Sequence, residues 1–350
     1  MTPNFLQKEI TVTHDLLNDK GHLENEGYAR KALLRYDRNR VKASKLRVKE
    51  WDYYYVVCPE YGYGITFTIS DLGYLGLTAI CWLDFNKKKY SQIDSVSLFP
   101  LGKTGLTPAP GDGNVSVHDK KISLSFDVKN NKRVLEFNCP DFQGINGESG
   151  LSGEIILHQD PEMDSMVIAS SWEENRKAFY YNQKTNCMPA EGTVKIGSEQ
   201  YQFHSANSFA GLDWGRGNWT YRNRWYWGSA SGLVNGEPFG FNIGYGFSDR
   251  KSASENMMFH KGVAHKLSDV EFSIDTENYL APWTFTSSDG RFELEFEPVM
   301  DRKSSTDLVI FKSVQHQVFG HFTGEVILDD GEKLHLDRFF GFAEDVLNWW

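Results

Sequence analysis

The sequence lacks the segments that would export or anchor a protein. Its 350 residues contain no apolar run that approaches the roughly 20 residues needed to span a bilayer. The N-terminal stretch MTPNFLQKEITVTHD has no apolar core of the kind that a signal peptide needs. Only four cysteines occur, widely spaced and without a CxxC pair, so nothing indicates a disulfide framework. We therefore expect free, buried thiols and a reducing, cytoplasmic location.

The common motifs of cofactor and metal chemistry are also absent. The chain has no P-loop, and no GxGxxG follows a predicted strand. It has neither HExxH nor HxH, and His260/His265 and His316/His321 are spaced so that a strand would direct each pair to opposite faces. The string GSASG at 228–232 has alanine where a nucleophile elbow requires serine. The sequence thus indicates no metal and no cofactor.

Acidic residues dominate the chain outside one short segment. Net charge is −10, yet residues 30–49 carry nine basic side chains and a single acid, Asp37. The rest is too acidic for nucleic acid to be a suitable partner. The basic segment either makes peripheral contact with an anionic membrane or is a solvated face that balances nearby acids.

Aromatic side chains and glycine are plentiful. Aromatics make up 14% of the residues and glycines number 31, which together favour β structure with many turns. Period-two alternation recurs between turn signals, as in 122–128 before the tip KNNKR and in 292–297. We predict an all-β fold of two packed antiparallel β-barrel-like halves with little helix.

The division into segments follows from composition. Residues 1–50 are polar and irregular, with one short helix expected near Tyr28–Tyr36. The N-terminal β-barrel-like half is expected over 51–190 and the C-terminal half over 191–350, because the composition shifts around 182–210. The oligomeric state is not determined by the sequence.

A hairpin over 225–247 is the sharpest local signal, since Asn235-Gly236 is a strong turn sequence. Odd positions hold bulky residues such as Trp225, Phe241 and Tyr245, and even positions are mostly glycine. This pattern predicts one bulky face and one bare face. The bare face would allow barrel curvature, a crossing strand or a ligand to approach the backbone.

The stretch GLDWGRGNWTYRNRWYW at 211–227 concentrates indoles and guanidiniums. Aromatic faces beside fixed charges suit a pocket for an apolar ligand, and equally suit an aromatic girdle stacked with arginine. As ligand-binding candidates we take Trp214, Arg216, Trp219, Tyr221, Trp225, Trp227, Asn242, Tyr245 and Asn256.

Three residues are candidates for proton transfer: Asp213, Glu255 and His316. A carboxyl against indole rings would be a general acid, because desolvation raises its pKa. The alternative for Asp213 is an ion pair with Arg216 that fastens a tight turn, with Gly215 and Gly217 at positive φ. The alternative for His316 is an ordinary hydrogen-bonded histidine on a strand. We expect Asp213 and Glu255 to share one cavity of the C-terminal half.

Several strings together resemble an uncharacterised family, domain-of-unknown-function family 2804. They are SDLGYLG (70–76), LDWGRGNWTY (212–221), GFNIGYGFSD (240–249), SEN (254–256), HKL (265–267), APW (281–283), HQVFGHFTG (316–324) and GFAED (341–345). The resemblance extends in fold to the carotenoid 1,2-hydratase, attachment-protein-like and tocopherol-cyclase-like group. That similarity implies two lipocalin-like barrels and chemistry on isoprenoid or polyketide substrates for some members, and no catalytic residue can be carried over from it.

Three functions remain open from the sequence. The first is a cofactor-free lyase, hydratase or isomerase acting on a small apolar, isoprenoid-like molecule. The second is a lipocalin-like carrier that binds such a molecule unchanged. The third is a glycan-active enzyme with Trp platforms and a carboxyl pair. A carboxyl buried beside a histidine would favour the enzyme, and acids ion-paired at a rim would favour the carrier.

Overall fold

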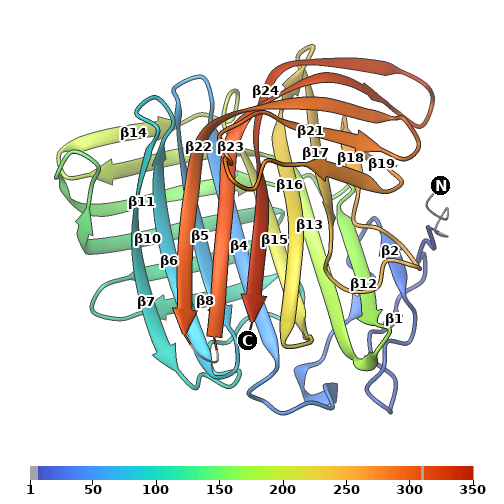
Figure 1. The fold of residues 1–350 in the computed structure, drawn as a ribbon. Coiled ribbons are helices and arrows are strands. Elements are labelled where there is room, and N and C mark those ends of the chain that lie inside the picture. The colour runs from blue at the N-terminus through green and yellow to red at the C-terminus, as the bar shows by residue number, and fades with distance from the viewer. Residues whose placement is uncertain (1–6, 309–310, 350) are drawn as a thin grey trace.

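The structure, a computed structural model, describes residues 7–308 and 311–349 and consists almost entirely of β-strands (Figure 1). The helical element in the described residues is one 3-10 turn, η1 (Arg38–Arg40). The strands of the first part are β1 (His14–Asp15), β2 (Gly27–Ala29), β3 (Leu34–Arg35), β4 (Lys49–Cys58), β5 (Tyr63–Asp71), β6 (Leu75–Asp84), β7 (Lys89–Leu98), β8 (Gly113–His118), β9 (Ser123–Lys129), β10 (Lys132–Gln143), β11 (Ser149–His158) and β12 (Met166–Trp172). The others are β13 (Asn175–Ile196), β14 (Glu199–Phe203), β15 (Phe209–Asn218), β16 (Arg222–Val234), β17 (Glu237–Tyr245), β18 (Met257–His260), β19 (Val263–Lys266), β20 (Val270–Ser273), β21 (Trp283–Ser287), β22 (Phe292–Leu308), β23 (Phe311–Ile327) and β24 (Lys333–Trp349).

Two large antiparallel sheets make up the molecule, and one curls into a half-barrel. The first has 13 strands along the order β7-β6-β5-β4-β15-β13-β11-β10-β9-β8, with β2, β12 and β14 attached. The second has nine strands in the order β19-β18-β17-β16-β24-β23-β22-β21-β20. Only the small β1–β3 pair among the described strands is parallel. The predicted all-β class is confirmed, and no described helix is long and apolar enough to cross a membrane.

Local patterns predicted the hairpins well. The KNNKR tip joins β9 to β10, with Asn130 and Asn131 at positive φ, and Asn235 and Gly236 take φ of 53° and 81° between β16 and β17. The four cysteines are free and buried, as expected. The helix predicted near Tyr28–Tyr36 was wrong, because these residues include β2, which pairs with β12 far along the chain. Tertiary strand pairing overrides local propensity here.

The chain passes from the first sheet to the second between Asn218 and Arg222. β15 lies in the first sheet, between β13 and β4, although the sequence prediction places all of 191–350 in the C-terminal half. The predicted division near 190 falls inside β13, a strand that carries on through the first sheet. The stretch GLDWGRG therefore belongs to the first sheet.

The two sheets pack against each other through aromatic side chains. Tyr53 on β4 meets Trp227 on β16 edge to face, with ring centroids 6.2 Å apart. Tyr55 meets Phe342 of β24 in the same manner, and its hydroxyl lies 2.9 Å from Ser229 Oγ. We call the region between β4, β13 and β15 on one side and β16, β17 and β24 on the other the inter-sheet layer.

The prediction of one bulky and one bare face for the 225–247 hairpin was wrong. Across the two-residue turn an odd position pairs with an even one, so Trp227 lies opposite Gly244 and Gly228 opposite Ile243. Each face therefore combines bulky residues of one strand with bare positions of the other. One of these mixed faces, with Trp227 and Gly244, contributes to the inter-sheet layer.

Candidate functional site

A buried ion pair lies at the centre of the inter-sheet layer. Lys184 on β13 and Asp213 on β15 are register partners, so both side chains stand on the same face of the first sheet. Lys184 Nζ lies 2.8 Å from Asp213 Oδ2, and Asn182 Nδ2 donates to Asp213 Oδ1 at 2.6 Å. All three residues are buried. Two donors thus hold the Asp213 carboxyl, Lys184 through an ion pair and Asn182 through a hydrogen bond.

The indole of Trp227 covers this pair from the second sheet. Lys184 Nζ lies 3.8 Å from the ring centroid, a cation–π contact in a buried setting. The indole Nε1 donates to Asn242 Oδ1 at 2.6 Å, and Asn242 Nδ2 donates to the backbone oxygen of Glu255 at 2.8 Å. Asn242, predicted to bind ligand, instead joins the indole to the segment that carries Glu255.

Glu255 enters the layer from the loop between β17 and β18. A Cβ built at Gly244 would lie 3.0 Å from Glu255 Oε1, so the bare position lets this carboxyl approach the strand backbone. Burial raises the pKa of Glu255, with Lys184 lowering it and Asp213 raising it further. Glu255 and Asp213 are therefore close enough for their charges to interact, although Asp213 lies on β15 of the first sheet and not in the C-terminal half, where the sequence prediction placed both.

Glu344 is a third carboxyl in this layer. It lies on β24 directly opposite Trp227 of β16 and Gln317 of β23. Within the described residues its carboxyl has no hydrogen bond and no ion pair. Burial raises the pKa of Glu344 to about 8; the charges of Lys184 and Asp213 act in opposite directions on it. Near neutral pH this residue is a protonated carboxylic acid that can donate.

Aromatic residues complete the surroundings of the three carboxyls. Burial raises the pKa of Tyr180 well above its ordinary value, and the charges of Glu255, Asp213 and Glu344 add to this. The Tyr180 ring stacks on Trp51, with centroids 6.2 Å apart. In the described part of the chain the Tyr180 hydroxyl makes no hydrogen bond, so it remains a neutral donor facing the acids.

Trp214 and Arg216 do not belong to this site, contrary to the sequence prediction. Both point into the interior of the first half, on the other face of β15 from Asp213, because adjacent strand residues alternate. Arg216 pairs with Asp52 at 2.9 Å, so the expected Asp213–Arg216 ion pair was wrong. Gly215 lies in a strand without positive φ. Its missing Cβ leaves room for the Trp51 ring, which would be 2.1 Å away.

His316 also lies elsewhere, on the other face of the second sheet. Its register partner is Asp345, whose neighbour Glu344 faces the inter-sheet layer. His316 Nδ1 lies 2.7 Å from Asp301 Oδ2, and its ring stacks on Tyr279. Tyr245 is on that face too, stacked on Tyr226. The histidine therefore cannot exchange a proton directly with the buried carboxyls.

The other candidates have structural or peripheral positions. Trp219 is buried edge to face against Trp51 and Phe247, and Trp225 also packs on Phe247 at the rim of the layer. Tyr221 is 44% exposed, outside the layer. Asn256 accepts from Gly244 N at 2.7 Å and donates to Ser268 O, so it holds the loop.

The surface hollows lie away from the buried acids. One of about 280 Å³ is lined by the 276–280 loop, Asp301, Lys303 and His316, and one of about 390 Å³ by residues of β1 and β3 with their connecting loops. Glu344 lines neither of these two hollows. The described residues contain no group of three or more His, Cys, Asp or Glu side chains arranged for a metal.

Sequence reasoning missed Lys184, Tyr180 and Glu344. A signal existed for Glu344, since it interrupts the alternating apolar positions Phe342 and Val346. Lys184 sits in YYNQKTNC, where no local pattern marks a buried cation. Its role depends on Asp213, which is its partner only through strand pairing.

The fold resembles several solved structures at low sequence identity. A protein of Nitrosomonas europaea assigned as AttH matches with a TM-score of 0.55 and 12% identity, over 89% of this chain and 95% of that one. Kievitone hydratase of Nectria haematococca matches with a TM-score of 0.51 and 14% identity, over 85% and 88%. CghA with Sch210972 matches with a TM-score of 0.54 and 11% identity, over 97% and 98%. A search among curated protein sequences found no match.

These features define an all-β protein of two packed sheets, sharing the architecture of AttH, kievitone hydratase and CghA, with buried carboxyls between the sheets. The chain belongs to the domain of unknown function family DUF2804, whose model matches residues 7–350. The resemblance inferred from the sequence strings is confirmed.

Proposed function

We propose that this protein is an enzyme that carries out cofactor-free acid–base chemistry on a small apolar molecule bound between its two sheets. The observation that carries the proposal is Glu344, a buried acid that has no hydrogen bond or ion pair within residues 7–308 and 311–349 and whose pKa is raised to about 8. An acid kept protonated in an apolar site is a device for proton donation. A merely structural carboxyl would be paired, as Asp213 is with Lys184.

Hydration of an alkene illustrates the chemistry that these groups support. The Glu344 O–H bond breaks as a C–H bond forms, which leaves a carbocation and the Glu344 carboxylate. The indole of Trp227 stabilises the cation through its π face. Water then adds to the cation, and the proton it loses returns to Glu344, so the net reaction is alkene plus water to alcohol. Isomerisation or cyclisation would use the same first proton transfer.

The fold is consistent with this proposal. Kievitone hydratase is by name a hydratase, and it shares the two-sheet architecture at 14% identity. Fold similarity at that level does not transfer a reaction. The arrangement of carboxyls, an ammonium and indoles in this chain is what favours proton transfer, and the aromatic surroundings favour an apolar substrate. The buried, free thiols are consistent with the proposed cytoplasmic location.

Incubation with apolar alkenes in D₂O tests the function. Native mass spectrometry of protein purified from its source would first identify a co-purifying apolar molecule. Proton transfer from Glu344 then places deuterium on carbon in the product. Glu344→Gln should abolish deuterium incorporation. The control Glu325→Gln, an exposed residue of β23 paired with Lys333, should retain it.

A carrier is the alternative, and the closed packing around Asp213 and Lys184 favours it. A carrier would co-purify with the molecule, bind it equally well after Glu344→Gln, and incorporate no deuterium. That result would replace the enzyme proposal. A glycan-active enzyme is disfavoured, because the indoles nearest the acids, Trp227 and Trp51, lie between sheets and form no open platform.

A further inference from the structure

The segment Ser254–Asn256, which carries Glu255, is fixed by a buried amine. Lys266, the last residue of β19, directs its Nζ to Ser254 Oγ at 2.8 Å, to the Asn256 backbone oxygen at 2.8 Å and to the Leu267 backbone oxygen at 3.0 Å. Two of these contacts flank Glu255 on either side. The amine is buried although part of the residue reaches the surface.

Neutral oxygens receive all three contacts of this amine. No carboxylate of the described residues lies within ion-pair distance of it, which is unusual for a buried cation. Three acceptors match the three donors of an ammonium group. The amine also faces the Tyr28 ring at 5.3 Å, supplied by the N-terminal segment.

Charged groups surround Lys266 at longer range. Burial lowers the pKa of Lys266 to about 7, with the carboxylates acting against this effect. The groups that act on it electrostatically are Asp269, Glu255, Asp289 and Arg30. Among them Glu255 is the one in the inter-sheet layer.

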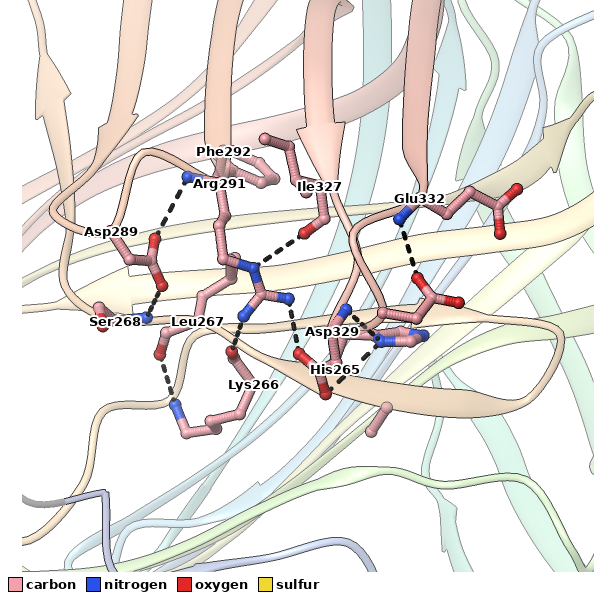
Figure 2. A network of polar contacts seen from close by, with 12 residues as sticks. His265, Lys266, Leu267, Ser268, Asp289, Arg291, Phe292, Ile327, Asp329 and Glu332 are labelled. Atoms are coloured by element: carbon pink, nitrogen blue, oxygen red, sulfur yellow. Dashed lines mark hydrogen bonds and ion pairs between the residues drawn. The ribbon is translucent and has the colours of Figure 1, made fainter.

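The backbone of Lys266 is itself anchored, as Figure 2 shows. Arg291 Nη1 donates to the Lys266 backbone oxygen at 3.0 Å. The same guanidinium donates to Ile327 O at 2.9 Å and to Asp329 Oδ1 at 2.6 Å, which ties β19 to the ends of β22 and β23. The backbone of Lys266 is therefore fixed, and its amine holds the loop through hydrogen bonds.

We propose that Lys266 is a positioning residue for the reaction assigned to the inter-sheet layer, holding Ser254 and Asn256 so that the Glu255 carboxyl lies against Gly244 and faces Asp213. This inference rests on the proposed function, because the position of Glu255 matters for catalysis only if the proposed reaction takes place. Lys266 acts in two ways. It fixes the segment through hydrogen bonds, and it interacts electrostatically with Glu255, whose charge raises the pKa of Lys266.

The test is a titration of carboxyl groups that requires no substrate. Glutamate side chains are labelled with ¹³C at the carboxyl carbon, and Glu255→Gln and Glu344→Gln assign the two signals. In Lys266→Met the titration midpoint of Glu255 should move up by about one pH unit or more, because a neighbouring positive charge is lost. The Glu344 midpoint should move less than that of Glu255, because Glu344 senses the change through the charge of Glu255.

Two further variants serve as controls for the Lys266→Met titration. Lys251→Met is the matched control: it removes an exposed lysine of the same loop, paired with Glu173, and should leave Glu255 unchanged. Lys266→Arg keeps the charge and should restore much of the Glu255 midpoint. A Lys266→Met protein that is less stable yet has an unchanged Glu255 midpoint would overturn the proposal.

A milder change covers the case in which Lys266→Met does not fold. Ser254→Ala removes one acceptor of the amine and leaves the lysine in place. It should shift the Glu255 carboxyl signal and increase the mobility of the Glu255 amide in ¹⁵N relaxation. A Glu255 signal identical to that of the unmodified protein would overturn the proposal. If the Glu255 signals respond as expected but no deuterium transfer occurs, positioning stands and the proposed function fails.

Discussion

The interior of the first half and the inter-sheet layer both bury a carboxylate next to a cation, and they differ in what is left unpaired. In the first interior all three guanidinium nitrogens of Arg216 donate to backbone oxygens, those of Thr107, Trp51 and Gly215, and Nη1 also forms an ion pair with Asp52 Oδ1 at 2.9 Å. Arg133 nearby is similarly occupied by Tyr54, Pro110 O and Gln159. In the inter-sheet layer Lys184 and Asp213 pair, while the Glu344 carboxyl stays free.

The difference separates the polar cluster of the first half, which stabilises the fold, from the inter-sheet layer, which contains an acid available for chemistry. Arg216 and Arg133 both bind carbonyl oxygens of the loop that leads into β8, so they fasten this loop over the first half. Their hydrogen bonds all serve the fold. An unpaired acid next to them would only cost stability. Burial of the unpaired Glu344 lowers the stability of the fold, which is expected where a function requires a protonated acid.

The largest effect should come from breaking the Arg216–Asp52 ion pair in the interior of the first half. Arg216→Met leaves the Asp52 carboxylate buried without its cation and frees the Thr107 loop. We expect a loss of about 3–5 kcal/mol in the free energy of unfolding. Urea denaturation followed by tryptophan fluorescence measures it. The double variant Arg216→Met/Asp52→Leu should recover most of the loss; equal instability of single and double variants would contradict the ion-pair explanation.

Glu344→Gln should increase the free energy of unfolding at high pH, by less than Arg216→Met decreases it. Folding raises the pKa of Glu344 from its ordinary 4.5 to about 8, so the folded protein favours the protonated form. The stability associated with this proton is present below pH 4.5 and is lost as the pH rises through 8. A pKa that differs by one between the folded and unfolded protein corresponds to roughly 1.4 kcal/mol. At pH 9 the glutamine variant should therefore be more stable by about 2–4 kcal/mol.

The pH dependence makes this second prediction specific. At pH 5 both folded proteins carry an uncharged side chain at 344, and only the unfolded glutamate is partly ionised, so their unfolding free energies should differ by less than about 1 kcal/mol. Chemical denaturation at pH 5, 7 and 9 would show the two curves diverging. If the free energies of unfolding of the two proteins change in parallel across this range, Glu344 is ionised in the folded protein. The inter-sheet layer would then contain no protonated acid.

Asp213→Asn should cost about 1–3 kcal/mol, because Lys184 then remains buried without its carboxylate. Asn182 can still donate to the new amide oxygen, which limits the loss. Since the negative charge of Asp213 raises the pKa of Glu344, its removal should also move the Glu344 midpoint to lower pH. Thermal unfolding and the ¹³C carboxyl titration measure the two effects. An unchanged Glu344 midpoint would show that the two carboxyls are not coupled.

The comparison also shows which parts of the molecule a sequence can predict. Hairpins such as β9–β10 follow from alternation and turn residues, which are local. The stretch DWGRG reads locally as a turn, because its glycines suggest positive φ. In the structure Gly215 is a strand residue whose missing side chain admits the Trp51 ring, a contact between distant segments. No local rule distinguishes those two uses of glycine.

Partners of buried charges were equally hidden. Asp213 and Arg216 are close in sequence, which predicts that they pair, yet they point to opposite faces of β15. Their true partners, Lys184 and Asp52, are supplied by neighbouring strands on either side. An acid and a base that are close in sequence can form an ion pair in a turn. In a strand they pair only if both side chains point to the same face of the sheet.

The smallest effect is expected at the basic segment 30–49, which contrasts with both buried clusters because its charges, except that of the buried Lys49, lie near water. Ion pairs within the described residues join Arg30, Lys31, Arg35, Arg38 and Arg40 to acids. Arg47 and Lys49 donate to backbone oxygens. Lys42 and Lys45 are left with no partner in the described part of the chain. Two free cations contribute about 1 kcal/mol each to binding an anionic surface, too little for stable attachment.

We therefore expect no sedimentation with phosphatidylserine vesicles at physiological ionic strength, where exposed charges are strongly screened. At low salt a weak interaction should appear, and Lys42→Glu/Lys45→Glu should remove it. Uncharged phosphatidylcholine vesicles are the control. Firm binding at physiological salt that survives this double change would mean that the paired arginines exchange their acids for lipid headgroups. The membrane contact considered from the sequence would then be real, and the ion pairs of this segment would be a switch instead of a solvated face.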